Sequence, residues 1–138
     1  MNKVFYSLFL IVLLTGCKSP VEKLLRSNDV ELKERKAQEF FEECDFASAS
    51  PIFKDLIQSF NTISKVEKVY FYYSYCDYKL QDYLLAAYEF KKIIKKFPKG
   101  KYVERAQFLL ADCYFQATPI YSLDQEYNLQ AVESFHVF

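Results

Sequence analysis

The sequence predicts an all-α fold in which helical hairpins stack into an α-solenoid, and three observations support this prediction. The chain of 138 residues contains only two glycines and no tryptophan, and Phe and Tyr make up 19% of it. This composition suits packed helices with bulky faces better than turn-rich sheets. A pattern of small and aromatic residues also recurs at a step of 37 residues, a length typical of two-helix repeat units.

The repeat is visible in two places in each unit. Ala37, Ser74 and Ala111 each begin a five-residue block that an aromatic residue closes, and the step between them is 37 residues both times. Small residues on two facing helices let the backbones approach, while aromatic rings fill the space beside them. Each unit is therefore predicted to be a helical hairpin. The second helices carry Ala-x-x-x-Phe pairs at 49/53, 86/90 and, after eight additional residues, 131/135.

The middle unit has the clearest helix start and stop signals. Residues 66–80 are predicted to form its first helix and residues 83–97 its second, with Asp82 as the N-cap between them and Pro98 as the stop. Lysines at 91, 92, 95 and 96 lie on the polar side of the second helix. They read either as a solvated face or as a site for an anionic partner.

In the first unit, one helix should begin near Lys33 and the next near Ser48. The late start avoids Pro51 in a helix interior, where it would cost about 3 kcal/mol. The last helix begins at Ala131 and the sequence ends inside it, so we expect about three helix pairs with the last one truncated. Such an N-terminal fragment should be poorly soluble alone, because repeat arrays need polar capping units.

The first residues predict export and lipid attachment. Residues 4–14 are apolar or small, a run too short to span a bilayer but typical of a signal peptide. Leu14-Thr15-Gly16-Cys17 resembles a bacterial lipobox, which implies cleavage after residue 16 and lipidation of Cys17. The alternative is an ordinary secretory signal. We expect a signal peptide at 1–16, a lipidated N-terminus with a flexible tether at 17–32, and the repeat domain at 33–138.

Charge and cysteine content exclude several classes of function. Removing residues 1–16 deletes one of 18 basic residues and no acid, leaving 17 against 18, so no nucleic-acid footprint exists. Cys76 and Cys113 are 37 residues apart and read as small buried side chains, although their redox state stays open. His136 is the only histidine, and no metal-ligand spacing occurs, so no metal and no cofactor is expected.

The middle unit resembles a tetratricopeptide repeat at Ser74, Ala86, Phe90 and Pro98. It departs from that family at Gln81, where a glycine is usual. The lipobox together with residues 70–76, 82–90, 111–114 and the loop 119–125 resembles more specifically the BamD-type outer-membrane lipoproteins of the β-barrel assembly machinery.

This resemblance implies a non-enzymatic scaffold, lipid-anchored to the outer membrane and facing the periplasm. Its expected partners are the β-barrel insertase, other assembly-machinery subunits and the aromatic C-termini of unfolded outer-membrane proteins. Alternatives are another periplasmic tetratricopeptide lipoprotein, serving the cell wall or division, or a helical-shell cell-wall hydrolase. A hydrolase would need an acid and base pair in a cleft, whereas Asp45, Asp82 and Asp124 read as helix starts.

In tetratricopeptide arrays the first helices line a concave surface, and carrying that register over predicts a peptide-binding face here. The alternative is that several of these rings pack only against neighbouring helices. The predicted residues are Gln38, Phe41, Phe71, Tyr75, Tyr78, Phe108, Asp112 and Phe115.

Overall fold

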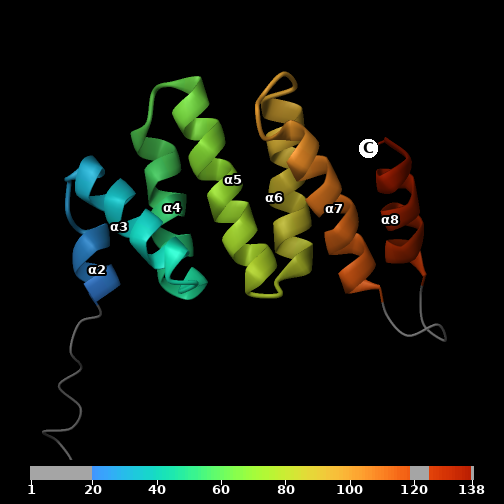
Figure 1. Ribbon diagram of the computed structural model, residues 1–138, viewed down its shortest axis with the longest axis horizontal. Coiled ribbons are helices and arrows are strands. Elements are labelled where there is room, and N and C mark those ends of the chain that lie inside the picture. Colours follow the sequence, from blue (N-terminus) through green and yellow to red (C-terminus); the bar gives the residue numbers. More distant parts are fainter. Residues whose placement is uncertain (1–19, 119–124, 138) are drawn as a thin grey trace, which may run out of the picture.

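The computed structural model describes residues 20–118 and 125–137, and within these ranges the chain forms seven helices and no strand (Figure 1). From α3 to α8, helices that follow each other along the chain pack together, so the hairpins stand in a row, and α2 packs on α4. The predicted all-α repeat fold is confirmed. The helices are α2 (Pro20–Leu25), α3 (Val30–Glu42), α4 (Phe46–Ser59), α5 (Ile63–Lys79), α6 (Tyr83–Lys96), α7 (Val103–Ala117) and α8 (Glu126–Val137).

The small residues of the repeat lie where the helices approach each other most closely. Ala37, Ser74 and Ala111 on the first helices have no exposed surface, and the same is true of Ala49 and Ala86 on the second helices. Backbones can pack this closely only where side chains are small. The repeat in the sequence therefore marks the helix-packing positions of the hairpins α3/α4, α5/α6 and α7/α8.

The turns of the first two hairpins have the same geometry. Cys44 and Gln81, which are 37 residues apart, adopt left-handed backbone conformations with φ of 61° and 66°. At each turn the next residue, Asp45 or Asp82, donates its backbone N–H to a carbonyl five residues back, and so closes a Schellman motif. Gln81 thus occupies a position that favours glycine, which explains why the tetratricopeptide pattern usually has glycine there.

The segment predicted as a flexible tether contains helix α2 and the first turn of α3, with residues 26–29 between them outside any helix, so the described part of it is largely ordered. α2 spans Pro20–Leu25, and α3 begins at Val30, three residues before the predicted start. Three apolar side chains hold this segment, because Val21, Leu24 and Leu25 pack against the core of the first hairpin.

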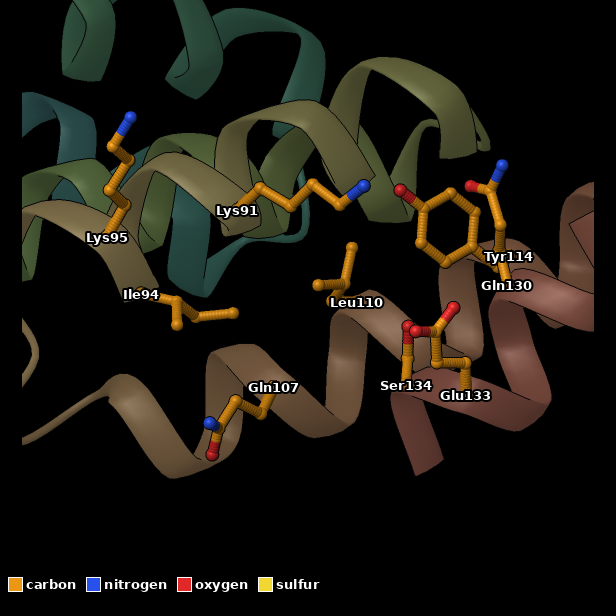
Figure 2. Close-up of a pocket in the computed structure, with 9 residues that line it drawn as sticks. All are labelled: Lys91, Ile94, Lys95, Gln107, Leu110, Tyr114, Gln130, Glu133 and Ser134. Atoms are coloured by element: carbon orange, nitrogen blue, oxygen red, sulfur yellow. The ribbon is translucent and has the colours of Figure 1, made fainter. Parts of the chain in front are cut away.

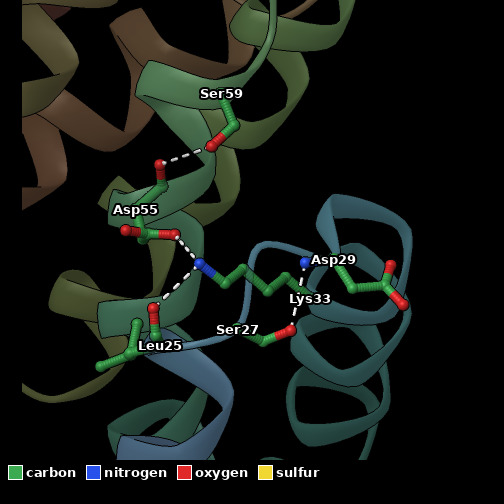
Figure 3. Close-up of polar contacts among 6 residues, drawn as sticks. All are labelled: Leu25, Ser27, Asp29, Lys33, Asp55 and Ser59. Carbon is green, nitrogen blue, oxygen red and sulfur yellow. Dashed lines mark hydrogen bonds and ion pairs between the residues drawn. The ribbon is translucent and has the colours of Figure 1, made fainter.

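Lys33 fixes α2 to the first hairpin (Figure 3). Its ammonium group donates to the carbonyl of Leu25, at the end of α2, at 3.0 Å and to Oδ2 of Asp55 on α4 at 2.6 Å. Lys33 is only 5% exposed. A buried ammonium group is stable only when hydrogen-bonded to such partners, so the contact joins α2, α3 and α4.

Helix boundaries elsewhere differ from the predictions by a few residues. α4 begins at Phe46 rather than near Ser48, because Asp45 caps it by accepting the N–H of Ser48 at 3.1 Å. Pro51 therefore lies inside the helix. It cannot donate to the carbonyl of Ala47, but Ala47 is exposed and water can take that place.

The middle hairpin agrees closely with its predicted bounds. α5 begins three residues early, and α6 begins at the predicted residue and ends at Lys96, one residue before the predicted end. Asp82 is the N-cap of α6, although its side chain makes no capping hydrogen bond. In the last hairpin, α8 begins five residues before the predicted position.

α5 is the central element, since it belongs to two hydrophobic cores. Val69, Tyr73 and Cys76 pack with α3 and α4, whereas Val66 and Phe71 pack with α6 and α7. The largest fully buried rings include those of Phe53, Phe71 and Phe90. The two cores therefore meet at α5. Its side chains also contact α3, through Tyr72 and Phe41, and α7, through Tyr78 and Asp112.

Candidate functional site

The predicted binding residues lie on α3, α5 and α7, whose common surface we call the first-helix face. Phe41 joins the first two of these helices. Its ring centroid is 4.8 Å from that of Tyr72 and 5.7 Å from that of Tyr75, both on α5. Phe41 is half-buried by these contacts, so it supports the face more than it offers a free ring.

Phe71 belongs to the core, which corrects the prediction that it lines the face. It is only 2% exposed, stacks on Tyr102 at 4.8 Å and lies 6.0 Å from Phe90 on α6. A ligand has no access to this ring. The alternative stated above, that some of the rings pack against neighbouring helices, therefore holds for Phe71.

Tyr75 and Tyr78 form the centre of the face. Both are half-buried, and their ring centroids are 5.9 Å apart on α5. Arg105 of α7 places its guanidinium 5.6 Å from the ring of Tyr75 and 5.4 Å from that of Phe71. A cation over an aromatic ring contributes about 0.5–1 kcal/mol at exposed sites, and here it links α7 to α5.

Asp112 is brought to the predicted face but its carboxylate is already engaged. The hydroxyl of Tyr78 donates to Oδ2 of Asp112 at 2.6 Å, across from α5 to α7. This hydrogen bond, with burial and the negative charge of Asp112, raises the pKa of Tyr78. This hydrogen bond holds α5 and α7 at a fixed distance. Because the carboxylate of Asp112 is engaged in it, the aromatic rings are the main groups left to contact a ligand.

Phe108 and Phe115 are the exposed aromatic residues of the face. They are 46% and 59% exposed and lie on the same side of α7, about two turns apart. The ring of Phe108 contacts that of Phe135 from α8 at 6.1 Å, in an edge-to-face arrangement. The open aromatic surface therefore lies at the α7 and α8 end of the row.

Gln38 lies in a different environment from the aromatic residues. It donates to Glu42 at 3.0 Å and lines a hollow of about 450 Å³ between α3 and α5. The other lining side chains are charged, namely Glu31, Glu34, Arg35, Glu39, Glu42 and Lys68. The aromatic part of the face thus runs from α5 to α8 and leaves out most of α3.

Arg105 is the residue of the face that the sequence reasoning missed. It lies three residues before Phe108 and so shares its helix side. The helical spacing from Phe108 was therefore the signal in the sequence that could have identified it.

A second hollow of about 370 Å³ lies on the other side of α7, between α6 and α8 (Figure 2). Ile94 and Leu110 give it an apolar floor, and Lys91 extends over the ring of Tyr114, 5.2 Å from its centroid. Glu133 lines the α8 side. This hollow faces away from Phe108 and Phe115, so it is separate from the first-helix face.

The described residues contain no group of three or more acids, cysteines or histidines arranged to hold a metal ion. Cys76 and Cys113 are buried and free, and Cys44 is exposed and free. Burial, with a nearby aspartate in each case, raises the pKa of Cys76 and of Cys113 to about 12. The two buried thiols therefore pack as small apolar side chains, as predicted, and stay protonated at neutral pH.

Comparison with known protein families identifies the family of this chain. The sequence profile of the YfiO family, described as outer membrane lipoproteins, matches residues 31–138. The chain belongs to this outer membrane lipoprotein family. The match covers α3 to α8, and thus every helix that contributes to the first-helix face of this YfiO-family protein.

Two further findings bear on this family assignment. A search of curated proteins finds no match to the chain. Among the helices that the structure describes, none is long and apolar enough to cross a membrane. The predicted signal peptide 1–16, the lipid attachment residue Cys17 and the loop 119–124 lie outside the described residues.

Proposed function

We propose that this YfiO-family protein is a lipid-anchored, non-enzymatic scaffold of the BamD type, which binds nascent β-barrel proteins and assists their insertion into the outer membrane. The observation that carries the proposal is the exposed aromatic surface of Phe108 and Phe115, beside the packed rings of Tyr75 and Tyr78. Exposed rings on a rigid array favour binding of another chain over solvation.

An aromatic C-terminal residue suits this surface. Edge-to-face or offset packing of a ligand ring against Phe108 or Phe115 contributes about 0.5–1.5 kcal/mol per pair beyond area burial. Arg105 lies about one turn before Phe108 on α7 and is exposed. Its guanidinium can pair with a terminal carboxylate, which gives a ligand with an aromatic terminus an advantage over internal segments.

Buried or half-buried acids such as Asp112 and Glu89 have structural partners, which supports a scaffold. Asp112 accepts from Tyr78, and Glu89 accepts from both Tyr70 and Lys92. A general acid or base needs to reach a substrate, whereas these carboxylates hold helices together.

Peptide binding at this face can be tested directly with a matched pair of variants. We expect Phe115→Ala to weaken binding of a fluorescent β-strand peptide ending in Phe by about tenfold, or about 1.4 kcal/mol. Tyr88→Ala is the control, because Tyr88 is 56% exposed, much like Phe115, but lies on α6. Equal binding by both variants, or preference for the same peptide without its terminal Phe, would contradict the proposal.

The assembly role is tested by partner capture. Full-length, lipidated protein is used as bait in detergent-solubilised membranes, and Cys17→Ala serves as the mislocalised control. Recovery of a large outer-membrane β-barrel with periplasmic repeats, lost with the control, is the expected result. Recovery of cell-wall enzymes without such a barrel would instead favour the cell-wall scaffold.

A further inference from the structure

The connections between α4 and α5 and between α6 and α7 form one end of the molecule, which we call the loop end. Both lie at the upper edge of Figure 1, while α2 and the turns after α3 and α5 lie toward the lower edge. A hollow of about 790 Å³ opens between the two connections. Asn61, Thr62 and Ser64 line one side of it, and Lys96, Lys99 and Lys101 line the other.

Charge at the loop end is strongly positive. Five lysines lie in or directly beside the two connections, and none of them forms an ion pair with a described residue. Instead, Lys65 lies over the ring of Phe60, and Lys96 over that of Phe97. The five are Lys65, Lys95, Lys96, Lys99 and Lys101.

The acid that lines this hollow does not neutralise it by pairing with lysine. Glu67 is only 5% exposed, and its carboxylate accepts the backbone N–H of Tyr102 at 2.7 Å. Across the hollow, α5 begins at Ile63 with Thr62 as N-cap, whose side chain makes no capping hydrogen bond. The first-turn N–H groups of α5 thus add positive potential to that of the lysines.

The end of the molecule opposite the loop end carries mainly negative charge. The turn after α3 contains Glu42, Glu43 and Asp45, and the turn after α5 contains Asp82. A merely solubilising surface mixes both signs of charge. In a chain with no net charge, lysines outnumber the acids Glu67 and Glu104 at the loop end, while acids outnumber Lys79 at the opposite turns. This uneven distribution indicates an interaction surface for an anionic partner.

The position of the anchor argues against the chain's own membrane as that partner, a step that relies on the proposed lipidation of Cys17. Three peptide units join Cys17 to Pro20, and they span at most about 11 Å. α5 alone, with 17 residues, is about 25 Å long. Because α2 lies toward the edge opposite the loop end and Lys33 holds it there, an anchor at Cys17 favours an orientation in which the loop end points away from the membrane.

We propose that the loop end is a docking surface for an acidic polypeptide segment, whose carboxylates enter the hollow lined by Lys96, Lys99 and Lys101. Ile63, which is 73% exposed at the rim, provides an apolar contact beside the charged one. The surface is distinct from the first-helix face, so the scaffold would hold two chains by different chemistry.

The test uses full-length lipidated protein in detergent micelles and a fluorescent peptide of alternating Glu and Ala, with binding read by anisotropy. Replacing Lys96, Lys99 and Lys101 together by Gln should weaken binding about tenfold. The control replaces the exposed lysines Lys54, Lys79 and Lys91 by Gln, which removes the same charge elsewhere. It should change the affinity less than twofold.

Three results would overturn the proposal. Equal losses in both triple variants would mean attraction by net charge alone, and no loss in either would mean that the loop end does not bind. Hydrogen-exchange protection of residues 60–65 and 96–102 by vesicles containing phosphatidylglycerol, with no peptide binding, would assign the surface to a membrane. Phe115→Ala should leave binding of this peptide unchanged, so failure here is separable from failure of the proposed function.

Discussion

The contact of Lys33 with Leu25 and Asp55 predicts an asymmetry between two substitutions that remove the same ion pair. Asp55→Ala leaves an ammonium group whose side chain is 7% exposed with one carbonyl as its acceptor. Removing one partner of a buried pair costs roughly 3–5 kcal/mol. Asp55 is 40% exposed, so solvent screens the pair and we expect a loss of about 2–3 kcal/mol.

Lys33→Met should cost less. The methionine fills the same channel, and the carboxylate left behind at Asp55 is exposed enough to be hydrated. The loss is then that of the two hydrogen bonds made by Lys33, about 1–1.5 kcal/mol. The double variant should resemble Lys33→Met alone, because no buried charge remains unpaired.

Urea unfolding followed by circular dichroism measures these differences. Lys36→Met is the matched control on the same helix, since Lys36 pairs with Glu39 where both side chains are about half exposed. It should change the free energy of unfolding by less than about 0.5 kcal/mol. The reasoning is refuted if Asp55→Ala is no more destabilising than Lys33→Met, or if Lys33→Met is indistinguishable from Lys36→Met.

Three further predictions follow from local geometry. Gln81→Gly should stabilise the protein by about 0.5–1 kcal/mol in thermal unfolding, because the left-handed conformation strains a side chain more than glycine; no gain would mean that the turn tolerates its Cβ. Gly100→Ala should destabilise by about 1–3 kcal/mol in urea, since a Cβ there would lie 2.2 Å from Oε1 of the buried Glu67. Burial raises the pKa of Asp77 above its ordinary value of 3.8. The folded state therefore binds the proton more tightly than the unfolded state does. As a result, the free energy of unfolding falls as pH rises from about 4 through the folded pKa. Asp77→Asn should flatten that dependence and raise stability at neutral pH, and an unchanged slope would assign it to another group.

The parts of the fold that the sequence predicted are those determined by contacts along one hairpin. Ala49 and Phe53 repeat at Ala86 and Phe90, and all four are buried at the α3/α4 and α5/α6 contacts. Such spacing indicates which side of a helix packs against its neighbour, because side chains three or four residues apart lie on the same side. Helix starts were predicted less accurately. In α4, for example, the capping residue Asp45 and the later Pro51 indicate different start positions.

The parts that were missed depend on contacts between distant segments. α2 is held through the carbonyl of Leu25, which accepts from Lys33, and Lys33 in turn pairs with Asp55, 22 residues away. Nothing near Lys33 in the sequence signals that its charge is buried. Phe71 shows the same limit within the site. Its helical register places it beside Tyr75, but the packing of Tyr102 over it comes from the connection after α6, and that connection converts a predicted surface ring into a core ring.

The last hairpin differs from the first two at its turn and in the exposure of its aromatic residues. Thr118 is 37 residues after Gln81, but its φ of −65° and ψ of 124° are extended, so the Schellman turn of the first two hairpins is not formed there. α8 consequently begins only at Glu126. Phe135, the counterpart of the buried Phe90, is 41% exposed and contacts Phe108 instead of entering the core. Aromatic rings from α7 and α8 therefore lie together at the surface that we propose binds the partner chain.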